Sequence, residues 1–85
     1  MKRVVEVQDD GGFESALGET ISLWCGVYIY SGKLVGVNED HVELDDAYIV
    51  YETGPLTDKH WKDAQLLPGR WRVMKGAIES WGVGK

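Results

Sequence analysis

An alternating run of residues from Ile21 to Tyr30 constrains the fold of this chain more than any other feature. The odd positions carry aliphatic or small apolar side chains, whereas the even positions include Trp24, Tyr28 and Tyr30. Successive side chains of a strand point to opposite faces, so this period of two predicts a strand over 21–30 with one buried aliphatic face. Ser31-Gly32 follows, and glycine readily adopts the positive φ of a tight turn. We therefore expect a turn at 31–32 and a second strand over 33–38.

The rest of the chain divides into short elements separated by glycine, proline and acidic residues. Gly36 inside the second strand indicates a sharp bend or a close approach of two backbones. After a polar turn at 38–40, residues 41–51 are expected to form a third strand with Val42 and Leu44 facing inward. Thr53-Gly54-Pro55 would end that strand. Two more strands are expected over 71–74 and 77–81, interrupted by Lys75-Gly76.

Two short helices are expected outside these strands. One covers 13–17, with Asp10 as its N-cap and Gly18 at its end. The other covers 58–67 and is capped by Thr57, because its apolar residues recur at helical spacing. We divide the remaining chain into an N-terminal arm that offers three valines for an edge strand, an insert and a frayed glycine-containing tail. These segments are 1–12 (with Val4, Val5 and Val7), 54–69 and 82–85.

The strand count predicts an all-β fold. Five short antiparallel strands are too few for two packed sheets, so they favour a strongly bent five-stranded barrel with a short N-terminal helix and a helical insert between strands three and four. The 85 residues are expected to form a single domain, 1–85. A domain of this size buries only roughly 60–65% of the surface that its unfolded chain exposes, so association with further copies would stabilise it.

Composition argues against several classes of function. Fourteen acidic residues outnumber nine basic residues, giving a net charge of -5, which opposes broad non-specific binding to nucleic acid. Cys25 is the only cysteine, so no intrachain disulfide can form and a zinc site lacks ligands. No long apolar run predicts a membrane span, and we expect a cytoplasmic protein. No catalytic constellation or nucleotide motif is present, so we expect no enzyme activity, no cofactor and no metal.

Two groups of residues resemble, in their order and spacing, the motifs of the Sm-like (LSm) family. The first group consists of Gly32, Gly36 and Asp40, followed by Leu44-Asp45-Asp46-Ala47. The second group is Val73-Met74-Lys75-Gly76-Ala77-Ile78. The resemblance covers residues 13–81 and is nearest to short Sm-like proteins of bacteria and their viruses.

The resemblance implies a non-enzymatic homo-oligomeric ring, in the pentamer to heptamer range, that binds single-stranded RNA or a protein partner. In Sm-like proteins, the turn after the second strand and the basic-glycine pair meet at the mouth of the pore. The RNA-binding residues implied here are Asn38, Asp40, His41, Lys75 and Gly76. Neighbouring Sm-like subunits pair the fourth strand of one with the fifth of the next, which closes a ring. The implied interface residues are Trp71, Val73, Ile78 and Trp81.

Two positions depart from the pattern of the family. Glu43 lies where an asparagine is usual in the first motif, and Lys75 replaces the usual arginine. Lysine is a point charge, whereas arginine stacks flat and pairs as a fork. An ordinary solvated turn at 38–41 is therefore the competing interpretation of this site.

Aromatic residues suggest two further candidate sites, each with two interpretations. Trp24, Tyr28 and Tyr30 would form a base-stacking platform or, as we favour, pack under the N-terminal turn or against a neighbouring subunit. Around the insert, basic and aromatic side chains alternate in a way that suits single-stranded nucleic acid. The interpretation that we favour there is docking of Trp61 on the barrel, with Arg70 and Arg72 facing solvent. The residues concerned are Trp61, Lys62, Arg70, Trp71 and Arg72.

Two other classes of function remain open. One is a structural ring or adaptor of a phage particle, which suits the acidic charge and predicts no affinity for RNA. The other is a monomeric SH3-like adaptor that binds a peptide in a groove formed by Trp24, Tyr28 and Tyr30. The native mass in solution separates the rings from the monomer.

Overall fold

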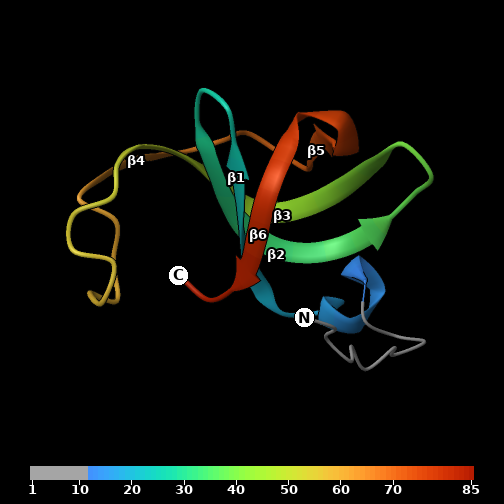
Figure 1. Ribbon diagram of the computed structural model, residues 1–85, viewed down its shortest axis with the longest axis horizontal. Coiled ribbons are helices and arrows are strands. Elements are labelled where there is room, and N and C mark those ends of the chain that lie inside the picture. Colours follow the sequence, from blue (N-terminus) through green and yellow to red (C-terminus); the bar gives the residue numbers. More distant parts are fainter. Residues whose placement is uncertain (1–11) are drawn as a thin grey trace, which may run out of the picture.

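The computed structural model describes residues 12–85 and contains one antiparallel sheet of six strands (Figure 1). The predicted all-β class is therefore confirmed, with one strand more than expected. Two short 3-10 helices, η1 and η2, accompany the strands. The bounds are η1 Phe13–Ala16, β1 Thr20–Cys25, β2 Ile29–Val37, β3 His41–Glu52, β4 Asp63–Leu66, β5 Trp71–Met74, η2 Lys75–Ala77 and β6 Ile78–Val83.

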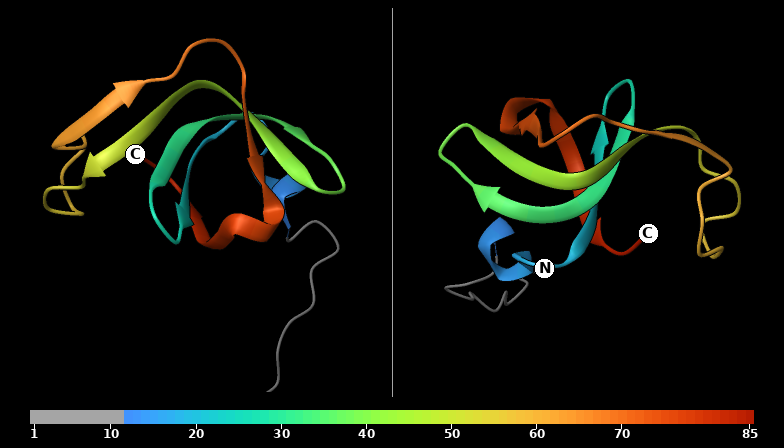
Figure 2. Two further views of the ribbon diagram at one scale, coloured as in Figure 1. Left: turned by 90° about the horizontal axis from the view of Figure 1, so that it is seen from above. Right: turned by 180° about the vertical axis from the view of Figure 1, so that it is seen from behind.

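The sheet is strongly bent, and β3 pairs with two different strands along one of its edges. Its first four residues pair with β5, and the segment from Tyr48 to Glu52 pairs with β4. The strand order is β4-β3-β2-β1-β6, and β5 pairs with β3 outside this path. Figure 2 shows β2 and β3 curving, with η2 connecting β5 to β6 across the open side. Within residues 12–85, β5 and β6 do not pair with each other, so the sheet is not closed.

The core lies inside this bend and contains the residues that the alternating pattern placed there. Ile21 and Leu23 from β1 and Val42 and Leu44 from β3 are completely buried. Burying such side chains contributes about 1.5–3 kcal/mol each to folding. The other buried members of the cluster come from η1, β2, β3 and β5, and they are Ala16, Leu34, Ala47 and Val73.

The first hairpin turns at residues 26–28, so the prediction of a turn at Ser31-Gly32 was wrong. Both of these residues are buried inside β2. A Cβ atom on Gly32 would lie 2.9 Å from Ala47 Cα, so this glycine permits close approach of two strands and does not form a turn. Tyr30 consequently pairs with Leu23, shares its face and packs against the core. The even-numbered aromatics of 21–30 therefore do not share one face.

The predicted helix over 58–67 was also wrong, because this region forms β4 and irregular turns. Ala64 pairs with Val50, and Leu66 pairs with Tyr48. The amide of Leu67 also donates to the backbone oxygen of Ala47, at 2.7 Å. Pairing with the exposed end of β3 satisfies more backbone groups than a short isolated helix would, and it overrides the helical spacing.

The predictions for the two chain ends had different outcomes. A short helical turn over Phe13–Ala16 is present, and it is followed by Gly18 with a φ of +89°. The predicted cap Asp10 and the valines of 1–7 lie outside the described residues. The strand predicted over 77–81 is observed as β6, Ile78–Val83, which extends into the predicted tail, and the amide of Gly84 donates to Thr20 O at 2.8 Å.

Candidate functional site

The polar turn between β2 and β3 was predicted correctly and is the starting point of the candidate site. The amide of Asn38 donates to the backbone oxygen of His41 at 2.8 Å, which closes the turn at 38–40. Gly36, just before it, lies beside a register shift between β2 and β3. A Cβ atom there would lie 2.7 Å from Glu43 Oε2, so the group closest to Gly36 is a side chain and not the second backbone that the sequence suggested.

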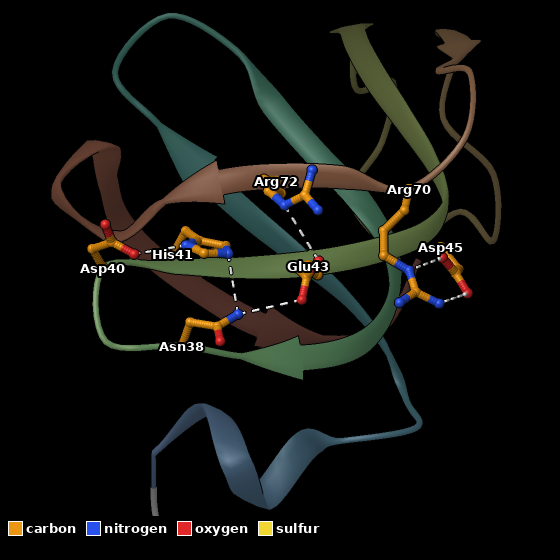
Figure 3. A network of polar contacts seen from close by, with 7 residues as sticks. All are labelled: Asn38, Asp40, His41, Glu43, Asp45, Arg70 and Arg72. Carbon is orange, nitrogen blue, oxygen red and sulfur yellow. Dashed lines mark hydrogen bonds and ion pairs between the residues drawn. The ribbon is translucent and has the colours of Figure 1, made fainter.

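A directional chain of hydrogen bonds connects the side chains of this turn (Figure 3). His41 Nδ1 lies 2.7 Å from Asp40 Oδ1, and His41 Nε2 lies 3.1 Å from Asn38 Nδ2. The same amide nitrogen donates to Glu43 Oε2 at 3.3 Å. A neutral His41 with its proton on Nδ1 satisfies all three contacts, because Nε2 then accepts from the amide. The hydrogen bond from His41 holds the pKa of Asp40 below its ordinary value.

Lys75 and Gly76 lie beside this turn, so the structure brings the sequence-predicted residues together. The amide of Lys75 donates to the backbone oxygen of Asp40 at 2.9 Å. The half-buried side chain of Lys75 places Nζ 5.8 Å from the centroid of the Phe13 ring, within range of a cation–π contact. Gly76 has open space around its Cα. The turn therefore combines an imidazole, an amide and one ammonium group with two carboxylates.

Arg70, just before β5, and Arg72 of β5 are paired with acidic residues of β3, as Figure 3 shows. Arg70 donates from Nε to Asp45 Oδ1 at 2.9 Å and from Nη2 to Oδ2 at 3.3 Å. This fork holds the pKa of the Asp45 carboxyl below its ordinary value and raises the pKa of Arg70. Arg72 Nε lies 3.4 Å from Glu43 Oε1. Both arginines are exposed, and each is already paired with a carboxylate that a phosphate group would have to displace.

An apolar groove of about 580 Å³ separates the β1–β2 turn from β5 and η2. Tyr28, Tyr30, Trp71 and Met74 contribute to its walls. Cys25 also lines it, and burial, together with the negative charge of Glu79, raises the pKa of the thiol. A raised pKa lowers the fraction of thiolate, which is the reactive form of cysteine. The groove was not predicted from the sequence, because the groove forms only when the hairpin turns at 26–28 and the turn was expected at 31–32.

The four proposed interface residues all contact the core of their own subunit. Val73 is buried, whereas Trp71, Ile78 and Trp81 are half-buried and pack against the core cluster. The ring of Trp81 also stacks on that of Phe13, with centroids 4.7 Å apart. A strand that pairs with β5 or β6 would therefore contact their backbone groups and the outward-facing side chains that alternate with these four residues.

Comparisons of this chain with models of protein families, with curated proteins and with solved structures found no match. Within residues 12–85, no cluster of three or more His, Cys, Asp or Glu side chains is arranged to hold a metal ion. None of the helices in this part of the chain is long and apolar enough to cross a membrane. The open strand edges, the groove and the polar turn are therefore the features that bear on function.

Proposed function

We propose that this chain is a non-enzymatic subunit that assembles with copies of itself into an Sm-like ring through β5 and β6. The observation that carries the proposal is that each of these strands has a partner on one side only within residues 12–85. An open edge presents a row of backbone donors and acceptors to any further strand. Among the described residues β4 is likewise paired on one side only, but pairing of β5 with the β6 of a copy joins two different edges head-to-tail, and such pairing forms a ring when the rotation between subunits closes.

Exposed apolar side chains on these strands support the same proposal. Met74 of β5 is 52% exposed, and Val83 of β6 is 60% exposed. The apolar groove adjoins β5, so a neighbouring β6 placed along β5 would also cover part of it. Burial of this surface would add a hydrophobic contribution to the backbone hydrogen bonds.

The native mass in solution, measured by light scattering after size exclusion at two concentrations, tests this proposal. We expect a concentration-independent mass of several protomers. Met74→Lys should reduce the mass to that of one protomer without unfolding the chain, whereas Leu66→Lys should not. Leu66 is a suitable control because it is similarly exposed, at 60%, but lies on β4. A wild-type monomer at both concentrations would contradict the ring.

Single-stranded RNA is the ligand that we propose for the ring, at the turn formed by residues 38–41 and Lys75. The support is the convergence of His41, Asn38 and Lys75 at one end of the subunit. An imidazole stacks on a base, an amide reads a base edge and an ammonium group attracts phosphate. Asp40 and Glu43 oppose phosphate at the same place, so binding should be weak and confined to few nucleotides.

Two observations favour other functions. The pairing of Arg70 and Arg72 with acidic residues favours a structural ring or adaptor, such as one in a phage particle, without affinity for RNA. The apolar groove favours a monomeric SH3-like adaptor, which would bind a peptide against Tyr28 and Tyr30. Trp24 does not line this groove but a separate hollow beside Trp61. The native mass separates the adaptor from both rings.

A further inference from the structure

The side chain of Lys85 lies in a cradle made by the segment between β3 and β4. Its Nζ donates to the backbone oxygen of Thr53 at 3.2 Å and to that of Pro55 at 3.3 Å. The same nitrogen lies 4.1 Å from the centroid of the Trp61 ring. A cation over the face of an indole is the strongest of the cation–π pairs that proteins form. Two carbonyl oxygens and one aromatic face thus surround a single ammonium group.

Two buried serines hold the backbone that leads to this lysine. Ser22 of β1 and Ser31 of β2 pair directly across the sheet and are both buried. Ser22 Oγ donates to the backbone oxygen of Gly84 at 2.7 Å, and Ser31 Oγ donates to that of Lys85 at 3.0 Å. Buried hydroxyl groups are costly unless they are bonded, so this pair specifies the position of residues 84–85. Lys85 also has a φ of +52°, a conformation that surrounding contacts must hold in place.

The cradle is accessible from its sides. Trp61 forms a wall of three hollows. Lys85 lines two of them, one together with Tyr48 and the other together with Leu56. The indole Nε1 of Trp61 is buried and has no hydrogen-bond partner among the described residues. A buried donor that is left without an acceptor costs free energy. The chain end that follows β6 lies near the segment between β3 and β4, as Figure 1 shows.

We propose that Trp61 and the backbone oxygens of Thr53 and Pro55 form a binding site for a primary alkylammonium group, which Lys85 occupies in cis. Occupation fixes the segment 53–62 against β1 and β6. A compact ammonium group suits this site because its three hydrogens reach two carbonyl oxygens and the ring from one point. Removal of the Lys85 ammonium group frees the site for an alkylammonium guest. The inference does not depend on ring assembly or RNA binding.

The indole signal of Trp61 in a ¹H–¹⁵N spectrum tests the site, with Trp61→Phe identifying that signal. Lys85→Met keeps the length of the side chain but removes its charge, and it should shift the Trp61 signal and the amide signals of 53–62. Lys62→Met is the matched control, because Lys62 adjoins Trp61 but pairs with Glu52 at 3.5 Å. Its Trp61 signal should stay close to that of the wild type. Equal shifts in both variants, or no shift in Lys85→Met, would overturn the proposal.

Titration with n-butylammonium chloride then tests the ligand class. In Lys85→Met the guest should move the Trp61 signal saturably toward its wild-type position, whereas sodium chloride at the same ionic strength should not. The wild type should not respond over the same range. If Lys85→Met fails to fold, the ε-methylene protons of Lys85 in the wild type decide the question. An upfield ring-current shift relative to the other lysines supports the site, and an ordinary shift overturns it.

Discussion

Gly32 in β2 lies against Ala47 in β3 so closely that a Cβ atom on the glycine would be 2.9 Å from the Ala47 Cα. The same Cβ would be 3.0 Å from the backbone oxygen of Asp45. Asp46, between these two β3 residues, has a φ of +51°, and the register of β2 against β3 shifts at this point. Bulges of this kind bend a strand. The bend of the sheet therefore depends on a close contact that only glycine permits.

Gly32→Ala should destabilise the protein, because backbone atoms of β3 would have to move to admit the methyl group. Overpacking of this kind typically costs about 1–3 kcal/mol. Urea denaturation followed by tryptophan fluorescence measures the change in the free energy of unfolding. Gly82→Ala is the matched control, since Gly82 also lies in a strand, has no positive φ and has nothing within 4 Å of an added Cβ. Equal stability of the two variants would contradict the proposed role of Gly32.

The parts of the fold that could be predicted are those where local pattern and tertiary pairing agree. The strand predicted over 41–51, the strand over 71–74 and the interruption at Lys75-Gly76 follow from alternation and glycine placement, and the first of these is observed as β3, His41–Glu52. The position of the first hairpin turn could not be predicted, because a glycine such as Gly32 is equally compatible with a turn and with a close contact between strands. The choice depends on Ala47, which is distant in sequence. The prediction of a helix in the insert was wrong for a similar reason, since β4 forms only because the end of β3 offers it a partner.

Leu44→Ala should strongly destabilise the protein. Leu44 is completely buried at the centre of the bend, so its truncation leaves a cavity that costs about 2–5 kcal/mol. Leu66→Ala makes the same chemical change at a position that is mostly exposed, and it should shift stability by less than about 1 kcal/mol. The two denaturation midpoints, measured under one set of conditions, check this prediction. Similar denaturation midpoints for the two variants would show that Leu44 is not part of the core.

The candidate site was predictable only in its components. The sequence motif placed Asn38, His41 and Lys75 at adjacent loops, and the structure brings them together. The sequence could not show that Glu43 completes the hydrogen-bond chain. Nor could it show that Arg70 and Arg72 lie opposite acidic residues of β3. Those contacts depend on the register Glu43 to Arg72, which no local pattern fixes. The cradle around Lys85 was missed because the glycines near it suggested fraying.

Stability should fall as the pH falls below about 4. The fork from Arg70 lowers the pKa of Asp45, and the hydrogen bond from His41 lowers that of Asp40, both relative to an ordinary value of 3.8. A carboxyl group with a lowered pKa in the folded state binds fewer protons there than in the unfolded state. Its contribution is therefore fully present above the unfolded pKa and is lost as the pH falls through the folded pKa.

Asp45→Asn checks the part of this dependence that comes from Asp45. The variant should be less stable than the wild type at pH 7, and the difference should shrink toward pH 2, because the wild-type carboxyl is then protonated. Asp58→Asn is the control, since Asp58 is exposed and forms no ion pair within residues 12–85. A difference that is constant with pH would show that packing, and not charge, causes the effect.

His41→Ala and Lys75→Ala should each weaken the binding of short oligouridine or oligoadenine while leaving the native mass unchanged. Loss of one stacked side chain costs about 1–3 kcal/mol, or roughly fivefold to more than a hundredfold in affinity. Lys75→Ala should also reduce the dependence of log affinity on log salt concentration by about one. Fluorescence anisotropy with labelled oligonucleotides at low salt measures both quantities. Lys62→Ala, a basic residue on the far β3–β4 segment, should change neither. Full affinity in both turn variants would move the RNA site elsewhere, and absence of binding by the intact ring would favour the structural ring.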